Sequence, residues 1–80
     1  MQTDVLVPLD CLHSGEQGEI VEVVAEPRWV ARLGELGVRA GALVRVLQPG
    51  SPCLLEVGGC RLSLRTDSAF QILVRPAAFA

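Results

Sequence analysis

The chain contains no lysine and no tyrosine, and its 80 residues include one tryptophan, two phenylalanines and one histidine. Its seven basic residues are all arginines, and nine acidic residues outnumber them, which gives a net charge of −2. Proteins that bind nucleic acid usually combine a basic patch with aromatic side chains that stack on bases. The sequence offers neither, so we expect no nucleic acid partner. The shortage of aromatic residues also argues against a groove that captures proline-rich peptides.

Long apolar segments are missing as well. No apolar run approaches the roughly 18–20 residues that a membrane-spanning helix needs. Asp4 lies early in the chain and Pro8 ends the short apolar run before it, so the N-terminus lacks the layout of a secretory signal. Three cysteines are an odd number, which argues against the disulfide framework of a secreted protein. We therefore expect a cytoplasmic protein without direct membrane insertion.

Hydrophobic residues, in contrast, make up 50% of the chain. A chain of this length forms one domain and buries roughly 60–65% of the surface that its unfolded form exposes. We expect a single domain over residues 1–80, with a core of about residues 5–75 and a short tail at 76–80. A small β-barrel that turns most strand residues inward would account for the hydrophobicity, and so would an exposed apolar binding patch.

Most of the chain is typical of short β-strands. Residues 19–24 alternate charged and aliphatic side chains, and this period of two indicates a half-buried strand. Further strands are predicted at 43–48, 53–57, 60–65 and 70–75, and a short apolar segment at 5–9 precedes them all. The pattern predicts a mostly β fold of five strands.

One short helix interrupts the strands between residues 25 and 37. Its apolar stripe recurs every three or four positions and consists of Trp29, Val30, Leu33 and Leu36. Pro27 suits the first turn of a helix, and Gly37 suits the left-handed position just past its end. We predict that this helix lies between the second and third strands.

A Gly-Gly pair at residues 58–59 predicts the two-residue turn of a tight hairpin. Counting back from this turn places Glu56 directly opposite Arg61 on the outer face. Cys53 and Cys60 then share the inner face, about 13 Å apart along the ladder, whereas a disulfide needs Cα atoms within roughly 7 Å. We expect both cysteines to be buried and unpaired.

Nine residues of the segment 32–46 follow one ordered pattern, Arg-Leu-x-Glu-Leu-Gly-(Leu or Val)-x-x-Gly-x-x-Val-x-Val. They are Arg32, Leu33, Glu35, Leu36, Gly37, Val38, Gly41, Val44 and Val46. An upstream Gly-x-x-Gly-x-Ile pattern is matched by Gly15, Gly18 and Ile20, and a downstream Ala-Leu-Arg ending is echoed by Leu62-Ser63-Leu64-Arg65. Over about residues 5–75 the chain resembles the FeoA family, the small cytoplasmic partners of the bacterial ferrous iron transporter FeoB.

This resemblance implies a small SH3-like five-stranded barrel with one short α-helix. It also implies a non-enzymatic accessory protein of ferrous iron uptake. Such a protein would bind the cytosolic portion of a FeoB-type membrane GTPase and modulate its assembly or activity. Related SH3-like domains are fused to the C-terminus of iron-dependent repressors, so the resemblance indicates the fold more firmly than the function.

The sequence offers few groups of residues that are suited to catalysis or to metal binding. Cys11 and His13 could ligate iron or zinc, but Cys-x-His is not a recognised metal pattern and no second ligand pair supports it. In the FeoA pattern these positions are ordinary polar turn residues. The carboxylates are scattered, and one histidine in a loop is a poor general base. We therefore predict no enzyme, no catalytic residues and no cofactor. Ferrous iron or another divalent metal at Cys11 and His13 remains the alternative.

A protein surface is the better candidate for function. Arg32, Glu35 and Arg39 surround Leu36 and Val38, which gives a polar rim about an apolar centre. We predict that these five residues contact the partner. The alternative is that Leu36 and Val38 simply close the end of the barrel.

Two other functions compete with partner binding. The first is a metal-responsive regulatory module, which would bind ferrous or manganese ions through Cys11 and His13. The second is a self-associating structural module, which would form oligomers as its concentration rises.

Overall fold

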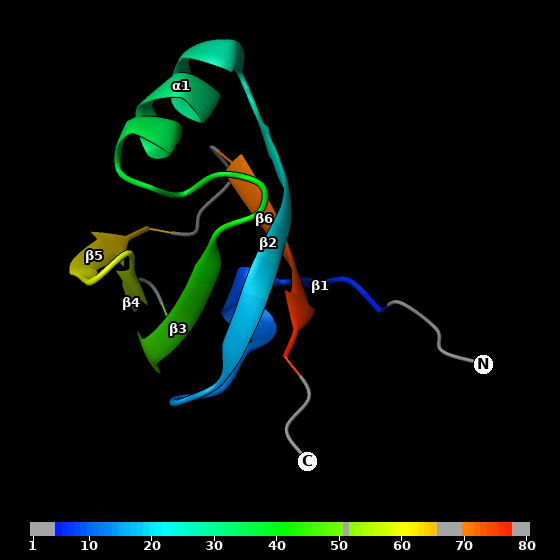
Figure 1. Ribbon diagram of the computed structural model, residues 1–80, viewed down its shortest axis with the longest axis vertical. Helices are drawn as coiled ribbons and strands as arrows, with labels where there is room; N and C mark the ends of the chain where they lie inside the picture. Colours follow the sequence, from blue (N-terminus) through cyan, green and yellow to red (C-terminus); the bar gives the residue numbers. More distant parts are fainter. Residues whose placement is uncertain (1–4, 51, 66–69, 78–80) are drawn as a thin grey trace.

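The computed structural model describes residues 5–50, 52–65 and 70–77. These residues form one six-stranded antiparallel sheet with a single α-helix (Figure 1). The strands are β1 (Val7–Pro8), β2 (Gln17–Ala25), β3 (Leu43–Gln48), β4 (Cys53–Val57), β5 (Cys60–Leu64) and β6 (Phe70–Pro76); the helical segments are η1 (Leu9–Cys11) and α1 (Pro27–Glu35). No helix in the described part of the chain is long and apolar enough to cross a membrane.

The mostly β fold and the position of α1 between β2 and β3 are confirmed, but the sheet has six strands rather than five. The additional strand is β1, in which Val7 pairs with Val74 and Pro8 pairs with Leu73. Of the predicted tail at 76–80, Pro76 ends β6, and residues 78–80 lie outside the described residues.

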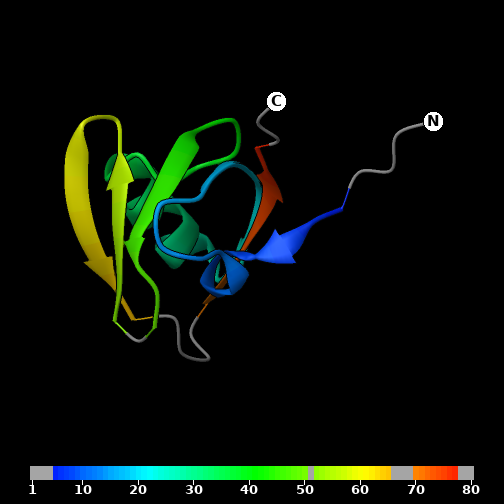
Figure 2. The same ribbon diagram turned by 90° about the horizontal axis from the view of Figure 1, so that it is seen from below.

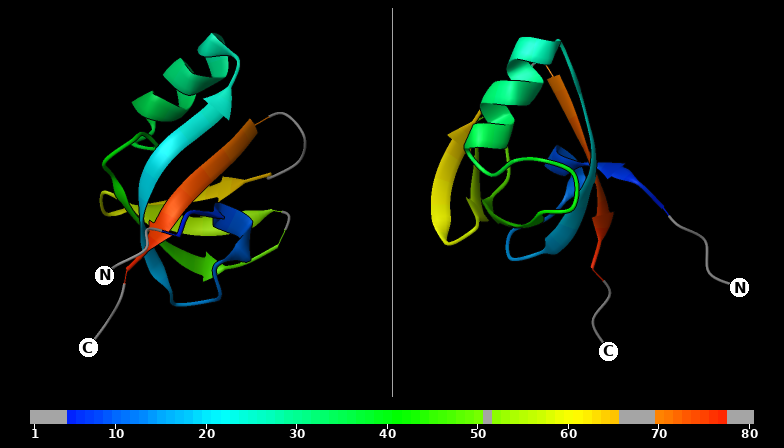
Figure 3. Two further views of the ribbon diagram at one scale, coloured as in Figure 1. Left: turned by 90° about the vertical axis from the view of Figure 1, so that its right-hand side faces the viewer. Right: turned by 45° about the horizontal axis from the view of Figure 1, so that its top comes forward.

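The strands follow the order β1-β6-β2-β3-β4-β5 across the sheet. The last strand of the chain, β6, therefore lies between the two strands that come first in sequence. Figure 3 shows β2 and β6 side by side, with β3, β4 and β5 crossing them at a steep angle. Figure 2 shows the β4–β5 hairpin on one side of the molecule and β1 on the other. Since β1 and β5 are the two edges of the ladder, the sheet is barrel-like but not closed.

Two register shifts contribute to this curvature. One lies between Ile20 and Glu22, where β2 pairs with β6, and the other lies between Val46 and Gln48, where β3 pairs with β4. A β-bulge bends its strand and increases the local twist, so the two halves of the sheet can face each other. Their inner faces enclose one apolar core, made of Leu9, Leu12, Ile20, Leu33, Val38, Val44, Val46, Cys53, Leu55, Val57, Leu64, Ile72 and Val74.

The β4–β5 hairpin confirms the register expected from its turn. Glu56 pairs with Arg61, and Gly58 and Gly59 both have positive φ, at 58° and 83°. Cys53 is buried as predicted, but the burial expected for Cys60 is wrong. Cys60 stands opposite Val57 at the turn end of the hairpin, so it shares the inner face, but there it lines an open hollow and is exposed.

Helix α1 has Pro27 in its first turn, as predicted, but its apolar stripe is only partly covered. Leu33 is buried, and Trp29 is half-buried with its ring centroid 6.0 Å from that of Phe70. Val30 and Leu36, the other two members of the predicted stripe, are exposed. The short helix therefore buries only part of its apolar stripe and leaves Val30, within the helix, and Leu36, at its C-terminal end, in solvent.

Candidate functional site

The C-terminal end of α1 has a well-defined capping geometry. The backbone N–H of Val38 donates to the carbonyl of Leu33 at 2.8 Å, and that of Gly37 donates to the carbonyl of Gly34 at 3.0 Å. Gly37 adopts φ = +96°, as expected for the left-handed residue of a Schellman motif. The motif turns Val38 into the core against Leu33, so the chain leaves the helix in one fixed direction.

The loop that follows, residues 39–42, is held against β2 by backbone hydrogen bonds. The N–H of Gly41 donates to the carbonyl of Ile20 at 2.7 Å, and the N–H of Ile20 donates to the carbonyl of Ala42 at 2.8 Å. The loop therefore has its backbone position set by a central strand of the sheet. Side chains that project from it are presented on a rigid support.

An open hollow of about 840 Å³ lies between this loop, the end of α1 and the β4–β5 turn. We call its rim the helix-end surface and define it by five exposed residues: Glu35, Leu36, Arg39, Leu43 and Cys60. Leu36 is 47% exposed and Leu43 is 68% exposed, which makes Leu43 the most exposed large apolar side chain in the described structure. In Figure 1 this region lies between the lower end of α1 and the turn that joins β4 to β5.

The helix-end surface also carries two opposite charges. Glu35 and Arg39 are both exposed, and neither forms an ion pair with any residue that the structure describes. Their charges are thus available to groups on another molecule. Two exposed leucines beside two available charges form the mixed apolar and polar surface that protein interfaces use.

Three of the five predicted interface residues, Glu35, Leu36 and Arg39, are brought together at this hollow. Val38 is not part of the surface, because its side chain is fully buried in the core. The alternative interpretation, in which the side chain closes the end of the barrel, therefore holds for Val38 but not for Leu36.

Arg32 lies apart from the other predicted interface residues. It lines a separate shallow hollow of about 280 Å³ together with Arg28 and Trp29. Arg32 lies in the last turn of α1, where its positive charge interacts favourably with the negative end of the helix dipole. The structure therefore gives Arg32 a role in the helix and does not place it on the helix-end surface.

Leu43 and Cys60 are the two residues of this surface that sequence reasoning missed. The signal was present in the alternation of β3, where Val44 and Val46 are buried and Leu43 and Arg45 are exposed. The alternation of β3 predicts that Leu43 faces outward, but only the structure shows that it stands beside the helix end.

The two candidate metal ligands, Cys11 and His13, have different neighbours in the structure. His13 is 88% exposed, its backbone N–H donates to Glu16 Oε1 at 2.6 Å, and its Nδ1 lies 3.0 Å from the same oxygen. These hydrogen bonds lower the pKa of the Glu16 carboxyl, with the backbone bond contributing most. Within residues 5–50, 52–65 and 70–77, no group of three or more His, Cys, Asp and Glu side chains could hold a metal ion.

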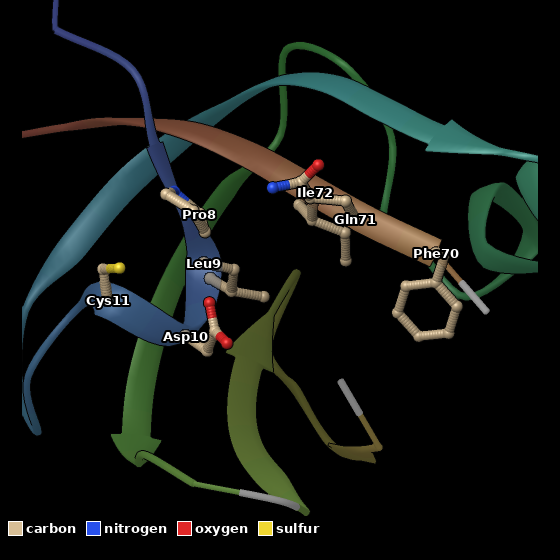
Figure 4. A pocket seen from close by; sticks show the side chains of 7 residues that line it. All are labelled: Pro8, Leu9, Asp10, Cys11, Phe70, Gln71 and Ile72. Carbon is tan, nitrogen blue, oxygen red and sulfur yellow. The ribbon is translucent and has the colours of Figure 1, made fainter. Parts of the chain in front are cut away.

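Cys11 lies instead at a second cavity of about 320 Å³, between η1 and β6. Figure 4 shows Asp10 and Cys11 on the η1 side and Phe70 at the far end on β6. Its lining residues include neither His13 nor Glu16, and its walls combine apolar side chains with those of Asp10, Cys11 and Gln71. This cavity therefore does not bring Cys11 and His13 together.

A family model described as the FeoA domain matches residues 7–76. The chain belongs to the FeoA family. The family is linked to ferrous iron uptake, and its known members are small accessory proteins. The sequence pattern at residues 32–46 has a structural explanation in this fold: Leu33 and Val38 are core residues, and Gly37 and Gly41 have φ of +96° and +94°.

Solved structures agree with this assignment. A crystal structure described as an iron uptake regulatory protein (FeoA) matches with a TM-score of 0.83 and 27% identity, over 91% of this chain and 100% of that chain. The solution structure of a FeoA protein from Chlorobium tepidum matches with a TM-score of 0.81 and 35% identity, over 90% of this chain and 71% of that chain. No curated protein matches the sequence.

The same fold occurs within larger proteins. The IdeR of T. acidophilum matches with a TM-score of 0.80 and 19% identity, over 96% of this chain but only 37% of that chain. At this level of identity the likeness concerns the fold alone. The SH3-like FeoA fold expected from the sequence is thereby confirmed.

Proposed function

We propose that this protein is a cytoplasmic, non-enzymatic accessory factor that binds the cytosolic portion of a FeoB-type membrane GTPase through the helix-end surface. Membership of the FeoA family supports the connection with ferrous iron uptake. The observation that carries the docking site is the exposure of Leu36 and Leu43 on fixed backbone, beside the available charges of Glu35 and Arg39.

Docking of this kind acts through differential affinity. A factor that binds one conformation of its partner more tightly than another shifts the partner's population towards the tightly bound state. The proposed mechanism therefore needs no chemical step and no resident metal ion. Rigid presentation of the loop 39–42 favours such binding, because little conformational entropy is lost when the surface docks.

The test is a binding titration between the purified chain and the cytosolic domain of a FeoB-type GTPase at low salt. Leu43→Glu and Arg39→Glu should each weaken binding by roughly tenfold or more, since one places a charge at the apolar centre and the other reverses a rim charge. Val24→Glu and Arg65→Glu are matched controls, because both residues are exposed and neither lines the helix-end surface. Equal binding by all four variants, or no binding by the unmodified chain, would refute the proposal.

A second arm separates docking from metal-dependent regulation. Addition of a chelator, or the double change Cys11→Ser and His13→Ala, should leave the titration unchanged. Binding that disappears with the chelator and returns with ferrous or manganese ions would favour the metal-responsive module instead.

A further inference from the structure

The helix-end surface is complementary to itself. It carries one acidic residue, Glu35, and one basic residue, Arg39, and neither finds an opposite charge elsewhere in the described chain. Its apolar part consists of exposed Leu36 and Leu43. A two-fold contact places the same patch on both sides, so residue i of one copy meets residue j of the other, and j meets i. Such a contact can bring each Glu35 to the Arg39 of the other copy while the leucines pack together.

We propose that two copies of this chain associate through their helix-end surfaces in a two-fold symmetric contact. The inference goes beyond the proposed function, because it requires no membrane GTPase and concerns the protein alone. Each copy would satisfy the other's two free charges and remove two exposed leucines from water.

The size of the surface indicates which class of interface it can form. A specific interface of standard size buries about 800 Å² on each partner, which is roughly 15% of the 5401 Å² exposed by this molecule. The five residues that define the helix-end surface are far fewer than the roughly 20–30 residues that each side of a standard interface contributes. We therefore expect a reversible dimer whose population depends on protein concentration, with the surface accessible to another partner at low concentration.

The first experiment is sedimentation equilibrium under reducing conditions, which prevent disulfides between the exposed Cys11 and Cys60 thiols. The mass of the unmodified chain should rise from its monomer value of 8.5 kDa towards twice that value as concentration increases. Leu43→Glu should stay monomeric, while the matched control Val24→Glu should associate like the unmodified chain. A monomer at every concentration, or a dimer that Leu43→Glu leaves intact, would overturn the proposal.

The second experiment tests the charge arrangement directly. Glu35→Arg and Arg39→Glu should each weaken self-association by about tenfold or more, because each creates like charges across the two-fold contact. A mixture of these two variants should form a heterodimer, since every cross-contact then joins opposite charges. The double variant should associate like the unmodified chain. Failure of the mixture and of the double variant to associate would exclude the paired arrangement.

These measurements are independent of the GTPase. If the unmodified chain associates with itself but does not bind the GTPase, only the proposed function is refuted. A monomeric chain that still binds the GTPase through Leu43 would refute only the dimer.

Discussion

Leu36 and Val38 are separated by one residue, yet Val38 is fully buried and Leu36 is 47% exposed. Gly37 between them, at φ = +96°, reverses the chain direction and sends the two side chains to opposite environments. The same three-residue segment therefore contributes to the core and to the helix-end surface at once.

Truncation of each side chain should separate these two roles. Val38→Ala should lower the free energy of unfolding by about 2 kcal/mol, because it removes buried apolar contacts and leaves a cavity. Leu36→Ala should change it by less than about 0.5 kcal/mol, as expected for an exposed position. Urea denaturation monitored by Trp29 fluorescence measures both values. Equal losses for the two variants would contradict the capping geometry described above.

The two glycines at the end of α1 should respond in opposite directions to alanine. Gly34 lies inside the helix, and a Cβ there would meet nothing within 4 Å, so Gly34→Ala should stabilise the protein by about 0.5–1 kcal/mol. Gly37→Ala should destabilise it by about 1–2 kcal/mol, because the left-handed conformation of residue 37 is unfavourable for a residue with a Cβ atom. Thermal unfolding of both variants provides the comparison, and a stabilising Gly37→Ala would show that the helix ends differently.

The three cysteines should differ in reactivity with a thiol reagent. Cys11 and Cys60 are exposed, whereas Cys53 is buried, and burial together with the nearby Asp10 charge raises the pKa of the Cys53 thiol. Since the thiolate is the reactive form, two thiols should react rapidly at pH 8 and the third only after unfolding. Cys60→Ser should remove one of the rapid thiols, and Cys53→Ser should leave both. Slow reaction of Cys60 would mean that the turn end of the hairpin is covered.

The His13–Glu16 contact should give the protein a small acid-sensitive contribution to stability. Hydrogen bonds from His13 hold the pKa of Glu16 below its ordinary value of 4.5. A folded-state pKa lower than the unfolded one stabilises the fold above the ordinary pKa, and that contribution is lost as the pH falls through the folded value. Glu16→Gln should therefore be less stable than the unmodified chain at pH 7, and the difference should shrink as the pH falls below 4.5.

Denaturation curves measured over this pH range provide the test. Glu22→Gln is the control, since the side chain of Glu22 forms no hydrogen bond with any residue that the structure describes. A stability difference for Glu16→Gln that does not vary with pH would show that the contact contributes nothing in solution.

Much of the fold could be predicted from short sequence signals. The Gly-Gly turn at residues 58–59 determined the hairpin register, and Pro27 and Gly37 marked the ends of the helix, because each depends on backbone conformation within a few residues. The pairing of β1 with β6 could not be found this way. It joins a two-residue strand to residues 73–74, and nothing in the short apolar start at 5–9 indicates that partner.

The candidate surface was predictable only in part. Glu35, Leu36 and Arg39 were found because they are neighbours in the sequence pattern, whereas Leu43 and Cys60 reach the same hollow from two strands. Cys60 also shows the limit of assigning faces by alternation. It stands on the inner face as expected, but whether an inner residue is covered depends on which elements extend over that end of the sheet.

The position of β6 between β1 and β2 also bears on how this protein is made. During synthesis the ribosome releases β1 to β5 before it releases residues 70–76, so β1 and β2 cannot form their ladders with β6 until those residues have emerged. Ile20 of β2 therefore pairs with Val74 only after more than 50 further residues have been made. Until that moment the aliphatic faces of β2 are open to chaperones and to other nascent chains.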